Sequence, residues 1–169
     1  CRSLKSSGCV MLKLGIESGD QTVLDTLYKG IDLQTISRAL KAIHKAGIAT
    51  YIYLLFGTPP ENEERARKTL SFTVDHHDCI DFLNLAIFNL PVLSAEAQNL
   101  ETATFYEGDL SLYKDFVHPL GWQRADVRKF LERTFKKHPA VAEIIQRTPD
   151  YFTSNHAPFC ILDKSAATV

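Results

Sequence analysis

Two short turns in this sequence carry residue types that can bind a small molecule or move a proton. The first reads GIESG over residues 15–19, and the second reads GTPPE over residues 57–61. A carboxylate accepts hydrogen bonds from an amino group or a sugar, and a serine hydroxyl both donates and accepts them. Glycine lets the backbone approach a ligand closely, and the two prolines stiffen the second turn. We therefore expect the functional residues to lie in these turns.

Both turns also have a purely structural interpretation, which the pattern alone leaves open. Ser18 or Asp20 can cap a following helix, and Glu17 would then be a solvated turn residue. Glu61 opens an acidic stretch that suits the positive end of a helix dipole. Under this interpretation the acidic side chains stabilise helices and bind nothing.

The two turns follow apolar segments that are expected to be strands of one sheet. The predicted strands are Val10–Gly15, Ile48–Phe56 and Phe82–Phe88, and helices are predicted after Asp20, after Asp32 and over Glu61–His77. Strands that alternate with helices imply an α/β fold with a parallel sheet and right-handed crossovers. Ligands bind at the carboxyl ends of such strands, which is where both turns are expected.

After Pro91 the hydrophobic pattern changes, and the chain divides into two parts. We expect residues 1–100 to contain the sheet and residues 101–169 to form a mostly helical C-terminal extension. Helices are predicted over Ser111–Val117, Arg124–Lys137 and Pro139–Arg147. The segment Tyr151–Val169 has no clear period, and its aromatic residues favour a cap over the sheet, with a substrate-facing segment as the alternative.

The composition excludes several classes of partner. The chain has 169 residues and a net charge of −1, so it lacks the basic footprint of a nucleic-acid binder or of a polybasic membrane patch. No apolar run approaches the ~20 residues that a transmembrane helix needs. The cysteines are Cys1, Cys9, Cys79 and Cys160, and their spacing matches no disulfide or zinc framework. Free thiols in a reducing, cytoplasmic setting are the expectation.

Three segments in order resemble the radical S-adenosylmethionine superfamily, most closely its methylthiotransferase-like and cobalamin-dependent branch. They are GIESGDQTVLDTLYKG, a helix ending in AIHKAGI, and YIYLLFGTPPE. The resemblance implies the C-terminal portion of a partial (β/α)6 TIM-like barrel with parallel strands. It also implies S-adenosylmethionine as cofactor and, in the intact parent protein, a [4Fe–4S] cluster that drives radical chemistry.

The same resemblance implies cofactor-binding roles for six residues. They are Glu17, Ser18, Lys29, Gly57, Pro59 and Glu61. The first two match a position that contacts the ribose or methionine part of the cofactor, and Lys29 matches a partner of the methionine carboxylate. The last three match a motif beside the adenine and methionine. The cluster motif CxxxCxxC is absent, so we expect a fragment that holds the cofactor, lacks the cluster ligands and is inactive alone.

Two other functions stay open. A non-radical (β/α)-barrel enzyme could use Glu17 and Glu61 as acid and base, or bind a phosphate at Gly57. A non-catalytic binding or assembly module is the second. The exposed edges of an incomplete barrel favour pairing with the missing N-terminal half or with another copy of the chain.

The histidines are weaker candidates for chemistry. The run at residues 76–79, His-His-Asp-Cys, is a poor metal site because adjacent residues of a helix face different directions. His118, His138 and His156 each lie near a proline and have no partner at metal-binding spacing. They are interpreted as surface or capping residues.

Overall fold

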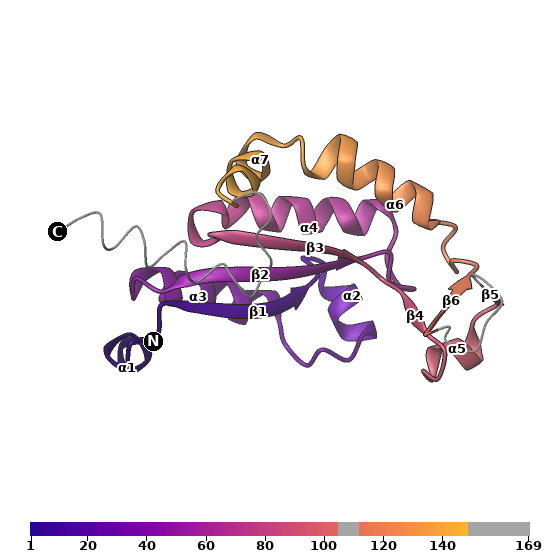
Figure 1. The fold of residues 1–169 in the computed structure, drawn as a ribbon, viewed down its shortest axis with the longest axis horizontal. Helices are drawn as coiled ribbons and strands as arrows, with labels where there is room; N and C mark the ends of the chain where they lie inside the picture. Colours follow the sequence, from indigo (N-terminus) through magenta and orange to yellow (C-terminus); the bar gives the residue numbers. More distant parts are fainter. Residues whose placement is uncertain (105–111, 149–169) are drawn as a thin grey trace.

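The computed structural model describes residues 1–104 and 112–148. The elements along the chain are α1 (Arg2–Ser6), β1 (Met11–Glu17), α2 (Gln21–Thr26), α3 (Leu33–Lys45), β2 (Ala49–Phe56), α4 (Glu63–Asp75), the 3₁₀ turn η1 (His77–Cys79), β3 (Phe82–Ile87), β4 (Leu90–Pro91), α5 (Glu96–Asn99), β5 (Thr102–Thr104), β6 (Tyr113–Phe116), α6 (Arg124–Phe130), the π-helical turn η2 (Leu131–Phe135) and α7 (Pro139–Gln146). Figure 1 shows their arrangement.

Three parallel strands in the order β1-β2-β3 form the main sheet. Ile52 of the central strand lies opposite Leu14 of β1 on one side and Leu83 of β3 on the other. The predicted α/β class and parallel sheet are therefore confirmed. The described strands do not close into a barrel, because β1 and β3 each pair on one side only within this sheet.

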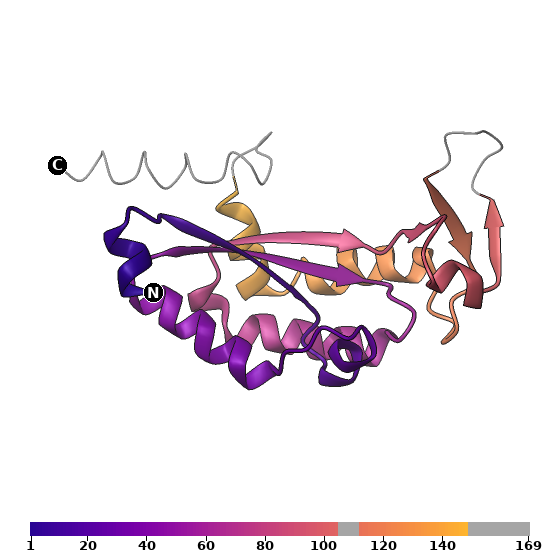
Figure 2. The same ribbon diagram turned by 90° about the horizontal axis from the view of Figure 1, so that it is seen from below.

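The connecting helices lie on one face of the sheet. Figure 2 shows α2, α3 and α4 beneath the three strands, and α7 extends this layer by packing against β3 and α4. Along β2, Ile52, Leu54 and Phe56 are buried in the core beneath the sheet. Tyr51 points to the opposite face, where its ring stacks on Phe82 with centroids 5.9 Å apart. Because β1 and β2 are parallel, the turns that follow them lie at the same edge of the sheet.

Side-chain caps determine where the helices begin. Asp20 and Asp32 each accept a hydrogen bond from the backbone N–H three residues on, at 3.0 and 2.7 Å. Both predicted caps are confirmed. Helix α4 begins two residues later than predicted, because its cap is Asn62, which accepts from the N–H of Arg65 at 3.0 Å. Glu61 is consequently left in the turn before the helix.

A small antiparallel sheet follows, in the order β4-β6-β5, which was not predicted. The helix expected over Ser111–Val117 is wrong, because Tyr113–Phe116 is strand β6 and pairs with β4 and β5. Exposure alternates along β6 with the two-residue period of a strand, and four residues are too few to show that period clearly in the sequence. Since β4 precedes residue 100, this sheet links the two predicted parts of the chain.

The last described helices agree with the sequence. The prediction over Arg124–Lys137 is confirmed by α6 and the turn η2, and Pro139 occupies the first turn of α7. The segment Tyr151–Val169 lies outside the described residues. Cys1, Cys9 and Cys79 are free thiols. In residues 1–104 and 112–148 no helix has both the length and the apolar character to cross a bilayer.

At Gly19, the turn after β1 packs closely against α4. A Cβ placed on Gly19 would lie 2.6 Å from Phe72 Cβ and 2.7 Å from Thr69 Cα. We predict that Gly19→Ala lowers the free energy of unfolding by about 3 kcal/mol, because the helix backbone must move away. Urea denaturation measures this loss.

The matched control is Gly30→Ala, at a glycine with φ +68 and no atom within 4 Å of the added Cβ. Only backbone strain opposes that change, so about 1 kcal/mol is expected. Equal losses of unfolding free energy in Gly19→Ala and Gly30→Ala would show that the close packing of α4 on Gly19 adds no cost beyond backbone strain.

Candidate functional site

The two acidic turns lie at the same edge of the sheet. β1 ends at Glu17 and β2 at Phe56, and these neighbouring strands run parallel, so their carboxyl ends meet. The arrangement agrees with the general position of ligand sites in α/β proteins. The two carboxylates, however, lie in different surroundings. The Glu17 side chain is 24% exposed, whereas Glu61 is completely buried.

The first turn presents an ion pair. Lys29 Nζ lies 2.9 Å from Glu17 Oε1, and both side chains are partly exposed. Glu17 has φ 67, a left-handed conformation that few residues other than glycine adopt. This backbone turns the carboxylate back over Gly15, where an added Cβ would lie 2.8 Å from Glu17 Oε1. A carboxylate and an ammonium group are thus held together beside the carboxyl end of β1.

Ser18, the next residue of the turn, is directed inward. Its hydroxyl lies 3.2 Å from Thr69 Oγ1 and accepts a hydrogen bond from the N–H of Asp20 at 3.1 Å. Its exposed fraction is 1%. The cofactor contact expected of Ser18 stays a prediction, since both of these bonds are internal. Their evident effect is to fasten the turn to α4.

The second turn is closed by a buried carboxyl group. The N–H of Gly57 donates to Glu61 Oε2 at 2.5 Å, while Glu61 Oε1 is buried without a hydrogen-bond partner. Burial raises the pKa of Glu61 to about 8, and the negative charge of Asp20 adds to the rise against the opposing effect of the Gly57 bond. Glu61 is therefore protonated at neutral pH. A protonated Glu61 does not supply the negative charge that the structural interpretation gave it as a helix-dipole partner.

The remaining residues of the second turn are enclosed by the C-terminal part. Gly57 has φ 75, and a Cβ there would lie 3.1 Å from Val127 of α6. Thr58 is buried, and Pro59 is half-buried. The carbonyl of Thr58 accepts hydrogen bonds from the N–H of Glu61 at 2.8 Å and from His118 Nε2 at 3.0 Å. Gly57 and Glu61 thus meet in one turn, while Glu17 and Lys29 meet in the other.

His118 corrects the interpretation of the histidines. It is 4% exposed and bound to the second turn, so the surface or capping role was wrong. Nothing in the sequence indicated this contact, because it joins residues 60 positions apart. His138 precedes α7 at its cap position, without a side-chain cap bond. His156 lies outside the described residues.

The run at residues 76–79 joins helices together. His76 lies 2.7 Å from Ser37 Oγ and 2.8 Å from the carbonyl of Phe72, which ties α3 to α4. In the described part of the chain, no three His, Cys, Asp or Glu side chains are grouped to hold a metal ion.

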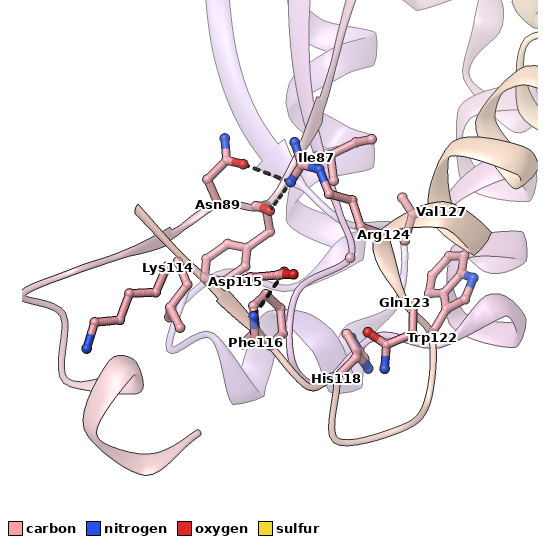
Figure 3. Close-up of a pocket in the computed structure, with 13 residues that line it drawn as sticks. Ile87, Asn89, Lys114, Asp115, Phe116, His118, Trp122, Gln123, Arg124 and Val127 are labelled. Atoms are coloured by element: carbon pink, nitrogen blue, oxygen red, sulfur yellow. Dashed lines mark hydrogen bonds between the residues drawn. The ribbon is translucent and has the colours of Figure 1, made fainter. Parts of the chain in front are cut away.

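A small pocket adjoins the second turn (Figure 3). It lies between the ends of β2 and β3, strand β6 and the start of α6, and Gly57, Phe88, His118 and Arg124 are among its lining residues. The space open to the centre of a water molecule is about 20 Å³, which admits a water but no cofactor. Arg124 closes one side by donating to the carbonyl of Phe88 at 3.2 Å and to Asn89 Oδ1 at 2.8 Å.

No family model matches this chain. A bacteriochlorophyllide d C-12(1)-methyltransferase of Chlorobaculum tepidum is 27% identical over 126 residues, which are 74% of this chain and 24% of the relative. An uncharacterized methyltransferase of Pyrococcus horikoshii is 31% identical over 71 residues, 42% of this chain and 16% of the relative. An uncharacterized protein of Methanocaldococcus jannaschii is 29% identical over 82 residues, 48% of this chain and 16% of the relative. The chain spans a quarter or less of each relative.

These names correct the family and the function expected from the two motifs. The relatives with a named activity are methyltransferases, so the assignment to the radical S-adenosylmethionine superfamily is wrong. The expected function as an iron–sulfur oxidoreductase is therefore also wrong, and the expected [4Fe–4S] cluster has no support. The physical reason is that both motifs encode local geometry. A glycine and an acidic residue after a parallel strand close a turn in α/β proteins of many activities.

The acid–base alternative gains no support from this geometry. It requires Glu17 and Glu61 to face one substrate, but neither carboxylate lines the pocket beside Gly57. A second, more open groove is lined by residues of α4 and α6 such as Arg67 and Lys129, and neither carboxylate lines it. Glu61 is also sealed from solvent. The role that the structure gives to Glu61 is to hold the turn.

The buried carboxyl group makes stability depend on pH in a defined direction. A glutamate that titrates near 4.5 when unfolded and near 8 when folded stabilises the fold below pH 4.5, and this contribution is lost as the pH rises toward 8. We predict that Glu61→Gln removes a slope of up to about 1.4 kcal/mol per pH unit between these values. Chemical denaturation of both proteins from pH 5 to pH 9 measures the difference.

The unfolding free energies of the two proteins are subtracted at each pH, because all other titratable groups are present in both. If the free energies of unfolding of the wild type and Glu61→Gln changed with pH in the same way, Glu61 would be ionised in the folded protein. That result would contradict the protonated, buried state described above.

Proposed function

We propose that this chain is the S-adenosylmethionine-binding part of a methyltransferase. The observation that carries the proposal is the match to the Chlorobaculum tepidum methyltransferase, which extends over 74% of the chain. A second methyltransferase matches 42% of it. S-adenosylmethionine supplies a methyl group bonded to a sulfonium sulfur. The part of the protein that binds it must recognise an ammonium group, a carboxylate, a ribose and an adenine.

The Glu17–Lys29 pair suits the amino-acid end of that cofactor. Its carboxylate can accept from the cofactor ammonium group or the ribose hydroxyls, and its ammonium group can pair with the cofactor carboxylate. The two charges are 2.9 Å apart and partly exposed, so a zwitterion can exchange partners with them at little desolvation cost. Ser18 supports this turn from within.

The second turn suits the role of a fixed wall. Gly57 and Pro59 set its shape, and Glu61 closes it with a bond to a backbone N–H and not by direct contact with a ligand. In this proposal the backbone of the turn borders the adenine or methionine part of the cofactor. A positive φ at Gly57 lets the peptide lie close to α6, which leaves little freedom for the turn to move.

We further propose that the three strands are an arc of a larger (β/α) barrel. Strands in sequential order with their helices on one face are typical of a singly wound barrel, since a doubly wound sheet carries helices on both faces. The outer edge of β1 has no strand partner among the described residues. A strand from the rest of a longer protein, or from a second copy, can pair there. The division at residue 100 and the cytoplasmic location stay predictions.

Calorimetric titration of the chain with S-adenosylmethionine tests the proposal. We expect saturable binding, and at least about tenfold weaker binding in the double variant Glu17→Gln/Lys29→Met, which removes both charges and keeps the side-chain sizes. The control is Lys41→Met, an exposed lysine of α3. It removes one positive charge and leaves the pair intact.

Two results would contradict the proposal. Absence of S-adenosylmethionine binding by the wild-type chain and by the longer protein that contains it would exclude the function. Binding that is equally strong in the double variant and in the control would exclude the pair as the recognition site.

A further inference from the structure

We propose that His118 is a positioning residue, which holds the turn at residues 57–61 in its shape from outside. His118 belongs to the segment between β6 and α6, so the C-terminal part of the chain would control the wall of the cofactor site. The part of this inference that concerns the cofactor rests on the proposed function. The part that concerns the turn rests on the contacts of His118 alone.

The bonds of the imidazole define its tautomer. Nε2 lies 3.0 Å from the carbonyl oxygen of Thr58, which can only accept, so Nε2 must carry the hydrogen. Nδ1 accepts a hydrogen bond from the N–H of Leu120 at 3.2 Å. The ring is 4% exposed and lies 5.9 Å from the ring of Phe116, centroid to centroid. Both nitrogens are therefore occupied, and the ring has one orientation that satisfies them.

The carbonyl of Thr58 is the point where two sets of bonds meet. Inside the turn it accepts from the N–H of Glu61, and the carboxyl group of Glu61 accepts from the N–H of Gly57. From outside it accepts from His118. A carbonyl oxygen has two lone pairs, so this acceptor is fully used. Without the imidazole, a buried acceptor and the N–H of Leu120 would each lose a partner.

The turn at residues 57–61 and the small pocket share His118 and Gly57. Gly57 and His118 both line the pocket. Figure 3 shows His118 with Phe116 and Val127, two further lining residues. Loosening of His118 would open the pocket toward the turn and release the backbone at Gly57. We infer that the orientation of this peptide depends on the segment from β6 to α6.

Amide hydrogen exchange of the whole chain, with and without S-adenosylmethionine, tests the inference. His118→Phe keeps a ring of similar size and removes both hydrogen bonds. We expect the amides of Gly57 and Glu61 to exchange about tenfold faster than in the wild type, beyond any increase seen in the rest of the chain. We also expect S-adenosylmethionine to bind about tenfold more weakly. His118→Gln places an amide nitrogen near the position of Nε2, and it should restore most of the protection.

The matched control is His76→Phe, which removes a buried histidine that joins α3 to α4 and makes no bond to the turn. It should lower stability without selective exchange at Gly57 and Glu61. Uniformly faster exchange in both variants would overturn the inference, because His118 would then be merely structural. Unchanged exchange in His118→Phe would overturn it too. Selective exchange without any cofactor binding would support the positioning role and reject the proposed function.

Discussion

One neutral carboxyl group, excluded from water, determines how the central strand of this protein ends. Glu61 accepts the N–H of Gly57, and this bond closes the chain into a turn just before the cap of α4. Burial of this carboxyl group favours its protonated form, and the bond from the N–H of Gly57 offsets only part of the cost of placing a charge there. The direction of α4 follows from the turn, and α4 in turn covers Gly19 and fixes the first turn beside β1.

The two turns consequently have different physical characters. The first has its charged groups at the surface, where Glu17 and Lys29 pair with each other and can exchange that partner for solvent or a ligand. The second keeps its polar groups inside, where the N–H of Gly57 and the carbonyl of Thr58 bond to other groups of the protein. A site with one adaptable, charged side and one rigid, uncharged side can orient a flexible molecule that has a zwitterionic end and a flat end.

Much of this architecture follows from local features of the sequence. The apolar runs predicted β1, β2 and β3, and the side chains of Asp20 and Asp32 predicted two helix starts, because these signals depend on nearby residues only. The contact of His118 could not be predicted, since it depends on the segment before α6 packing over a turn 60 residues away. The burial of Glu61 could not be predicted either, because it is a property of the folded chain and not of the neighbouring residues. Strand β6 was taken for a helix because its partners are distant in sequence. The family was misjudged for a related reason: a turn motif reports the shape of the backbone and leaves the chemistry of the whole protein unspecified.

If Glu17 binds the ligand as proposed, its left-handed backbone makes stability and ligand recognition favour different residues at this position. A glycine at this position would relieve about 1 kcal/mol of conformational strain and would also delete the carboxylate beside Lys29. Mutant libraries screened for heat resistance should therefore enrich glycine or asparagine at residue 17, whereas libraries screened for ligand retention should keep the acid. Selection of this protein for stability alone would therefore remove the Glu17–Lys29 ion pair from its surface.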